Sequence, residues 1–172
     1  MNSRSMLEKQ FADHIIKNKE RYYRLAYSYV KNVDDALDIV QESIYKAMSS
    51  LDSLRNPAYF RTWFYRIVVH TALDFLRQRN KTVLVEEEVL INSNSGTCDT
   101  YQDIDLKRAL DSLPAKYRTI IILRYFEDLK IDDVAEILDE NVNTIKTRLY
   151  TALRKLRIEM VDNNEIGRIC HE

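Results

Sequence analysis

The stretch N-T-I-K-T-R-L-Y-T-A-L-R-K-L-R-I at 143–158 decides the fold of the second half of the chain, because its side chains separate onto different faces of one helix. The apolar stripe consists of Ile145, Leu149, Ala152, Leu153 and Leu156. The opposite ridge carries hydrogen-bonding side chains and the flanks carry cations, an arrangement that suits base edges and phosphates of the DNA major groove. A preceding amphipathic segment at 131–138 and a polar turn at 139–141 complete a pattern typical of a helix-turn-helix. A basic face that is merely solvated would show the same pattern. The rest of the chain therefore decides between a DNA-binding helix and a solvated one.

Composition narrows the fold class to all-α. The chain has 172 residues but only two glycines and two prolines, which strands and tight turns require. It shows neither a signal peptide nor an apolar run long enough to cross a membrane, so we expect a cytoplasmic protein. Cys98 and Cys170 lack the spacing of metal ligands and are expected to be free thiols. We therefore expect no metal and no cofactor.

Charge is segregated along the chain in a way that predicts its domain organisation. Residues 1–80 contain 13 basic and 9 acidic side chains, whereas residues 81–105 contain one basic and six acidic ones. The segment 80–103 also loses the helical period and becomes rich in Asn, Ser, Gly and Thr. We therefore predict two small helical domains, 1–79 and 104–172, joined by a flexible acidic linker at 80–103.

A second amphipathic helix is predicted from Asp34 to Leu51. Its apolar stripe consists of Leu37, Val40, Ile44, Ala47, Met48 and Leu51. Its other face consists of Asp34, Asp35, Asp38, Gln41, Glu42 and Tyr45. Acidic residues at a helix N-terminus favour the macrodipole, which alone would account for the first two aspartates. An acidic face that extends further and includes a tyrosine also suits docking of a basic protein partner.

A third helix is predicted from about Ala58 to Arg79, with Pro57 at its first turn. Its core stripe consists of Phe60, Phe64, Ile67, Val68, Thr71 and Phe75. A second stripe of Trp63, Arg66, His70 and Arg77 combines aromatic and basic groups. Aromatic rings stack on unpaired bases while cations follow the phosphates, so this stripe suits single-stranded DNA. The alternative is that the tryptophan belongs to the core and the arginines are solvated.

Four segments, taken in order, resemble a known family. They are D-D-A-L-D-I-V-Q-E-S-I-Y-K-A at 34–47, Y-F-R-T-W-F-Y-R-I-V-V-H-T-A-L-D-F-L-R at 59–77, A-L-D-S-L-P-A-K-Y-R-T-I-I-I-L-R-Y-F-E-D-L at 109–129, and V-A-E-I-L-D-E-N-V-N-T-I-K-T-R-L-Y-T-A-L-R-K-L at 134–156. In this order and spacing they closely resemble the extracytoplasmic-function (group four) sigma factors of bacterial RNA polymerase. The resemblance covers roughly residues 6–158.

The resemblance implies a role for each face. The acidic face of 34–47 would bind RNA polymerase core. Recognition and opening of the minus-ten element would fall to Arg55, Asn56, Tyr59, Arg61, Trp63, Arg66, His70 and Arg77. Recognition of the minus-thirty-five element would fall to Asn143, Thr144, Lys146, Thr147, Arg148, Tyr150, Arg154 and Lys155. The acidic linker, with Glu86, Glu87 and Glu88, would pass through the polymerase cleft. The resemblance further implies a membrane-anchored anti-sigma factor as partner, an envelope or stress response as setting, and a monomer when free, with no insertion of this chain into the membrane.

Two neighbouring residues depart from the family pattern. Family members usually have glycine and then an apolar residue in the turn of the helix-turn-helix, whereas this chain has Asp139 and Glu140. Asn141 and Asn143 can supply a helix cap and tolerate unusual backbone angles. The turn therefore affects the exact placement of the last helix, and not its existence.

Two other classes of function have to be weighed. A dimeric helix-turn-helix regulator that acts on palindromic DNA would account for the last helix but not for the segment 59–77. A helical enzyme such as a nuclease would need a catalytic constellation, yet His14, His70 and His171 show no metal-binding spacing. Neither a paired-carboxylate motif nor a phosphate-binding loop is present in the sequence, so we expect no catalytic residues and no enzymatic activity.

Overall fold

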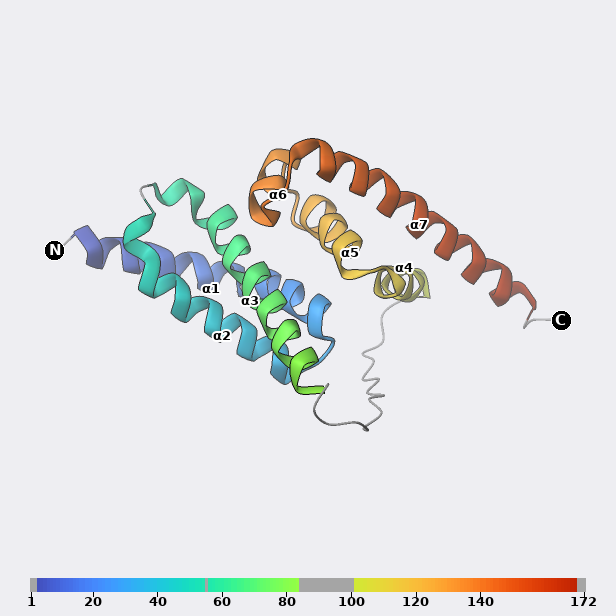
Figure 1. Cartoon of the computed structure of the whole chain (residues 1–172), viewed down its shortest axis with the longest axis horizontal. Helices are drawn as coiled ribbons and strands as arrows, with labels where there is room; N and C mark the ends of the chain where they lie inside the picture. The colour runs from blue at the N-terminus through green and yellow to red at the C-terminus, as the bar shows by residue number, and fades with distance from the viewer. Residues whose placement is uncertain (1–2, 55, 84–100, 170–172) are drawn as a thin grey trace. The chain divides into compact units, whose positions relative to one another are not determined.

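The computed structural model describes residues 3–54, 56–83 and 101–169, and within these ranges the chain is helical, without strands. Two compact units divide the chain, one built from the helices α1 to α3 and one built mainly from the helices α4 to α7 (Figure 1). The all-α fold, which the scarcity of glycine and proline predicted, is confirmed, and so are the two helical units that the charge pattern predicted.

The first unit is a bundle of three helices, α1 (Ser3–Val30), α2 (Val33–Ser50) and α3 (Phe60–Val83), each of which packs against the other two (Figure 1). Short 3-10 turns, η1 (Leu51–Ser53) and η2 (Pro57–Tyr59), lead from α2 into α3. The core is aromatic: the rings of Tyr22 and Phe64 meet edge to face, with their centroids 4.6 Å apart. Such edge-to-face pairs add a specific geometry to the area that the rings bury.

Local signals fix where the helices of this bundle begin. The side chain of Asn32 caps α2 by accepting a hydrogen bond of 3.0 Å from the backbone N–H of Asp35. Asn56 does the same for the turn η2, where its Oδ1 accepts from the backbone N–H of Ala58 at 2.9 Å. Pro57 follows as the first residue of that turn, where its missing N–H costs nothing.

The second part of the chain forms α4 (Tyr101–Ser112), α5 (Ala115–Ile121), the π-helical turn η3 (Ile122–Phe126), α6 (Ile131–Leu138) and α7 (Val142–Ile169), most of which belongs to the second unit. The helices α4 and α5 both pack on α7. The side chain of Arg118 is buried and donates hydrogen bonds to the carbonyls of Asp111 and Leu113, at 3.1 and 3.4 Å. A buried guanidinium thus fixes the turn that joins α4 to α5.

Several predicted boundaries were wrong. α3 continues to Val83 and α4 begins at Tyr101, so both ends of the segment 80–103, predicted as linker, are helical. The remaining part, 84–100, lies outside the described residues and includes Glu86, Glu87 and Glu88. The last helix was predicted over 143–158 but runs from Val142 to Ile169. The boundaries were missed because the prediction rested on the helical period of apolar residues, which is lost toward these helix ends.

The predicted apolar stripes were correct only in part. In α2 the buried residues are Ala36, Ile39, Ser43 and Ala47, followed by Leu51 in η1. Leu37, predicted to be core, is instead 52% exposed. In α7 the stripe is buried at Ile145, Leu149 and Ala152, whereas Leu153 is 37% exposed. Small residues on the buried faces let α2 approach its neighbours closely, and a search for large apolar side chains cannot see that.

Candidate protein and nucleic-acid interfaces

The acidic face of α2 is presented outward as a continuous surface. Asp34, Asp38, Gln41, Glu42 and Tyr45 are exposed, and the ring of Tyr45 is 70% exposed. Asp35 differs from the others because it is half-buried and accepts a hydrogen bond of 3.2 Å from the guanidinium of Arg79 in α3. This pair ties α2 to the end of α3, so the Asp35 carboxylate is already engaged within the bundle.

A groove of about 590 Å³ adjoins this face and is lined by residues of both α2 and α3. Its α2 wall consists of Asp38, Ile39, Gln41, Glu42, Tyr45 and Lys46, and its α3 wall of Thr71, Asp74, Phe75 and Gln78. The amine of Lys46 lies 3.7 Å from a Glu42 carboxylate oxygen and 3.3 Å from the Thr71 hydroxyl, so it bridges the two walls. The α3 wall escaped the sequence analysis because only folding brings residues so far apart in the chain to one groove.

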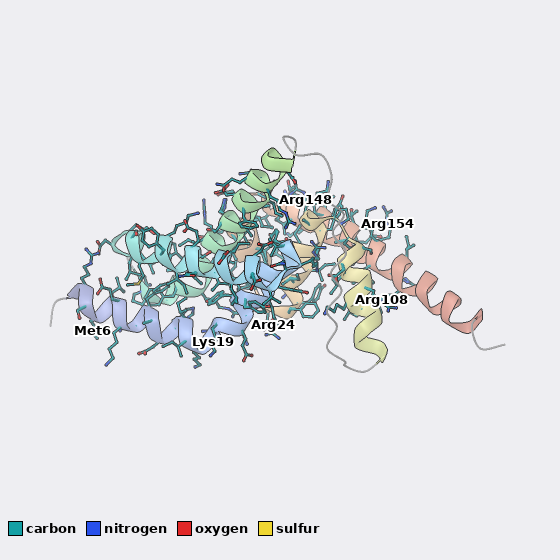
Figure 2. The ribbon with its side chains drawn as sticks, turned by 90° about the horizontal axis from the view of Figure 1, so that it is seen from below. Met6, Lys19, Arg24, Arg108, Arg148 and Arg154 are labelled. Carbon is teal, nitrogen blue, oxygen red and sulfur yellow. The ribbon has the colours of Figure 1, made fainter. Side chains whose placement is uncertain are left out.

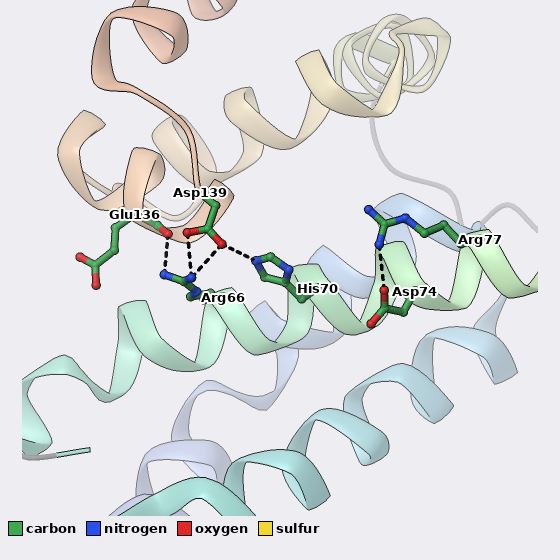
Figure 3. A network of polar contacts seen from close by, with 6 residues as sticks. All are labelled: Arg66, His70, Asp74, Arg77, Glu136 and Asp139. Atoms are coloured by element: carbon green, nitrogen blue, oxygen red, sulfur yellow. Dashed lines mark hydrogen bonds and ion pairs between the residues drawn. The ribbon is translucent and has the colours of Figure 1, made fainter. Parts of the chain in front are cut away.

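The aromatic–basic stripe of α3 lies along one side of that helix, where Figure 3 shows Arg66, His70 and Arg77. Arg66 and His70 are half-exposed, and Arg77 is exposed. A guanidinium nitrogen of Arg77 donates to a carboxylate oxygen of Asp74 at 3.0 Å, an i, i+3 pair within the same helix (Figure 3). Because both side chains are exposed, this pair contributes little to stability and Arg77 can exchange it for another anion.

Trp63 is neither fully core nor fully exposed. Its ring is half-buried and meets the ring of Phe11 edge to face, with centroids 5.8 Å apart. Ahead of α3, Tyr59 is 59% exposed, and Asn56 is exposed beside it. Arg61 is half-buried, and Arg55, also predicted for this surface, lies outside the described residues. This surface thus offers the exposed ring of Tyr59 and the ring of Trp63, which packs against Phe11.

The unusual turn between α6 and α7 has a defined geometry. Asp139 adopts the left-handed region with φ 54°, at the position where glycine is usual. The N–H of Glu140 donates to the carbonyl of Ala135 at 3.0 Å. The N–H of Asp139 donates to the carbonyl of Glu136 at 3.4 Å. These two bonds form a Schellman motif, so the turn keeps the standard helix ending without glycine. Asn141 then caps α7, because its Oδ1 accepts from the N–H of Asn143 at 2.8 Å.

On α7, six of the eight predicted DNA-binding residues are exposed: Asn143, Lys146, Thr147, Tyr150, Arg154 and Lys155. Thr144 and Arg148 are half-buried. The guanidinium of Arg148 donates to a carboxylate oxygen of Glu140 at 2.7 Å, a pair that the sequence analysis missed. The chain separates these two residues by eight positions across a turn, a spacing that helix periodicity alone does not connect. Figure 2 shows Arg148 and Arg154 on this helix.

The described residues contain neither a metal-binding cluster nor a membrane-spanning helix. Within the ranges that the structure describes, His, Cys, Asp and Glu side chains do not gather in groups of three or more that could hold a metal ion. Over the same ranges, each helix is too short or too polar to cross a bilayer.

Comparison with known proteins identifies the two units. Residues 15–82 match the family model described as sigma-70 region 2, and residues 103–156 match sigma-70, region 4. The chain is 56% identical over 146 residues to the RNA polymerase sigma factor SigV of Bacillus subtilis (strain 168), covering 85% of this chain and 88% of that protein. It is 30% identical to the ECF RNA polymerase sigma factor SigW of the same organism, covering 88% and 89% of the two chains.

The fold agrees with a solved structure. The sigma factor RpoE of Bartonella quintana, determined in complex with the anti-sigma factor NepR, superposes with a TM-score of 0.79 at 26% sequence identity, covering 88% of this chain and 97% of that one. The chain therefore belongs to the extracytoplasmic-function family of sigma factors, the transcription initiation factors that bind RNA polymerase core and direct it to specific promoters.

Proposed function

We propose that the three exposed surfaces divide the work of initiation: α2 docks on core polymerase, α3 and the turn before it open the minus-ten element, and α7 reads the minus-thirty-five element. The observation that carries this division is the separation of charge between helices. The exposed face of α2 is acidic, whereas the outward faces of α3 and α7 combine cations with hydrogen-bonding or aromatic groups. One surface thus suits a basic protein and the others suit nucleic acid.

For the docking surface, the relevant groups are Asp38, Glu42 and Tyr45 together with the adjoining groove. Carboxylates on the rim steer a basic partner and fix its register, while an exposed aromatic ring supplies apolar contact area. The side chains of Leu37 and Tyr45 are 52% and 70% exposed, so apolar area is available on the same helix. A basic amphipathic helix of the polymerase would satisfy both properties.

For the minus-ten element, Tyr59 and Trp63 supply ring faces. Arg66 and Arg77 supply cations, and His70 supplies a polar ring. The exposed ring of Tyr59 can stack on a base without disturbing the core. For the minus-thirty-five element, the exposed side chains in the first turns of α7 would meet base edges, as helix-turn-helix proteins do. Arg154 and Lys155, further along the helix, would meet phosphates.

Control by an anti-sigma factor is part of the same proposal. The related sigma factor from Bartonella quintana was solved bound to such a protein, and this chain resembles it over most of its length. We infer a cytoplasmic site of action, because the polymerase acts there, and a membrane-anchored anti-sigma factor that restrains the free chain. Pull-down of the chain from its native cell would recover polymerase subunits and that protein together.

The decisive experiment adds the purified chain to core polymerase from its native bacterium and supercoiled DNA of a promoter selected with that holoenzyme. We expect a transcript that starts at this promoter only when the chain is present. Tight binding of palindromic duplex by a dimer without a transcript would instead support an ordinary helix-turn-helix regulator. DNA cleavage would support an enzyme. A chain that carries Asp38→Lys and Glu42→Lys is the matched control, because it keeps the buried residues and should fail at polymerase binding.

A further inference from the structure

Glu140 is fixed at both its backbone and its side chain. Its N–H donates to the carbonyl of Ala135 at 3.0 Å, and its carboxylate accepts from the guanidinium of Arg148 at 2.7 Å. The side chains of the pair are about one third exposed, at 34% and 32%. A partly desolvated, charge-assisted hydrogen bond of this length is stronger than a typical solvent-exposed ion pair. Glu140 therefore connects the turn to a point two helical turns into α7.

The position of this carboxylate creates an electrostatic problem for a DNA-binding helix. Glu140 stands two residues before the first residue of α7, Val142, at the end of the helix where the macrodipole is positive. An unpaired negative charge there would repel phosphates that the helix end would otherwise attract. Arg148 cancels that charge within the protein. The same hydrogen bond engages a guanidinium that the sequence analysis predicted to contact the minus-thirty-five element.

We propose that Arg148 is a positioning residue and not a phosphate contact: its bond to Glu140 persists on DNA and sets the angle at which α7 leaves the turn. The proposal rests on the proposed role of α7 in reading the minus-thirty-five element. The Schellman motif around Asp139 fixes the turn on the α6 side, and the cap from Asn141 fixes the first turn of α7. The Glu140–Arg148 pair adds the third restraint, the only one of these that reaches beyond the first turn.

This role differs in kind from that of Arg154. Arg154 is exposed on the same helix, so it serves as the reference for a phosphate contact. Loss of one phosphate contact lowers the slope of log affinity against log salt by about one and leaves base preference unchanged. Loss of a positioning pair has the opposite signature, because no phosphate contact disappears while the side chains that meet the bases shift.

The experiment compares the parent chain with the double variant Glu140→Ala/Arg148→Ala and with Arg154→Ala. The double variant removes the pair without altering net charge, so its salt slope reports contacts and not a charge change. Each full-length chain is assembled with saturating core polymerase, and binding is measured on a promoter library with a randomised minus-thirty-five element at several salt concentrations. Circular dichroism checks that every variant keeps its helicity.

We expect the double variant to keep the salt slope of the parent and to change base preference at one or two positions, whereas Arg154→Ala lowers the slope by about one and keeps the preference. A slope that falls by about one in the double variant overturns the proposal, and so does an unchanged preference. If the parent itself shows no minus-thirty-five preference, the proposed role of α7 fails, and that result is distinct from either.

A second pair of variants keeps the test decisive if the double variant does not fold. Glu140→Gln retains an oxygen that accepts from Arg148, whereas Glu140→Ala does not. We expect the glutamine variant to keep the base preference of the parent and the alanine variant to shift it. The same preference in both variants, changed or unchanged, contradicts a positioning role for the pair.

Discussion

The imidazole Nε2 of His14 lies 2.6 Å from the hydroxyl of Tyr22, two helical turns further along α1. Tyr22 is fully buried, and its ring packs on that of Phe64. Burial lowers the pKa of His14 below its ordinary value of 6.5, and the nearby cations of Arg61 and Lys17 lower it further. The folded first unit therefore prefers the neutral imidazole.

Because of this preference, the first unit should lose stability in mild acid. The unfolded chain binds a proton at His14 more readily than the folded chain does, so the free energy of unfolding rises with pH. The contribution of His14 to that free energy is complete above pH 6.5. We expect it to fall as the pH drops from about 7.5 to about 5.5, before most carboxylates titrate. Urea unfolding across this range measures the slope. His14→Gln should flatten it, and an equal slope in both proteins would show that other groups cause it.

Core binding should depend on the acidic face of α2. Asp38→Lys with Glu42→Lys reverses two exposed charges without touching the buried residues of the helix. Reversal of close charge pairs costs on the order of several kcal/mol, so we expect affinity for core polymerase to fall by well over about tenfold. A core-binding titration with a labelled chain measures this.

A matched control separates this effect from net charge. Asp13→Lys with Glu20→Lys makes the same charge change at exposed positions of α1. We expect this control to bind core nearly as the parent does. Equal losses in both variants would mean that overall charge, and not the α2 face, determines docking.

Strand separation should distinguish Tyr59 from Trp63. Tyr59 is 59% exposed, so Tyr59→Ala should lower permanganate reactivity of promoter thymines without loss of folding stability. The ring of Trp63 packs on Phe11, so Trp63→Ala should lower reactivity and also destabilise the first unit by about 1–3 kcal/mol. Trp63→Phe, which keeps a ring, is the control for packing. Parental thymine reactivity in all three variants would remove this surface from the transcription bubble.

The turn before α7 gives a prediction about backbone strain. Asp139 holds φ at 54°, where glycine has no steric penalty and a β-branched residue has a large one. We expect Asp139→Gly to slow amide exchange at the Schellman bonds of the turn, and Asp139→Val to destabilise the turn between α6 and α7 by about 1–2 kcal/mol. Hydrogen exchange of peptides that cover 136–145 measures both. Tolerance of valine would mean that the turn adopts a different backbone in solution.

The sequence predicted the helices better than it predicted what packs between them. Periodicity located α6 at both ends, and the acidic side of α2 is exposed as expected. The same periodicity placed Leu37 and Leu153 in the core, because it ranks side chains by size and hydropathy. The structure buries Ala36 and Ser43, which the periodicity did not place in the core. A close approach of two helices needs small residues at their contact, and which face makes that contact depends on the neighbouring helices.

The candidate surfaces show the same limit. The pattern within each single helix predicted most of the outward residues of α2 and α7. It could not predict contacts between side chains of different elements. The α3 wall of the groove and the pair of Glu140 with Arg148 both depend on how the chain turns. A third such relation concerns Lys155, whose amine lies 6.0 Å from the centre of the Tyr117 ring on α5. That contact is at the outer limit of a cation–π interaction, so it leaves the amine available to another partner.

Reading of the minus-thirty-five element should separate Lys146 from Lys155. Both are exposed, but Lys146 lies in the second turn of α7 and Lys155 lies more than two turns further along. The first turns of a recognition helix meet base edges, so Lys146→Ala should cost about 1–3 kcal/mol and relax the preference at one or two positions. Lys155→Ala should weaken binding to all promoters about equally and lower the salt slope by about one.

A library of minus-thirty-five variants, bound by holoenzyme at two salt concentrations, measures both effects together. Asn141 and the Schellman motif fix the start of α7, so the two lysines cannot exchange roles without a change in that turn. If Lys155→Ala changes the preferred sequence while Lys146→Ala does not, the helix enters the groove in the reverse sense. The loss of a cap in Asn141→Ala would then be the next variant to test, since it loosens the same turn without removing a cation.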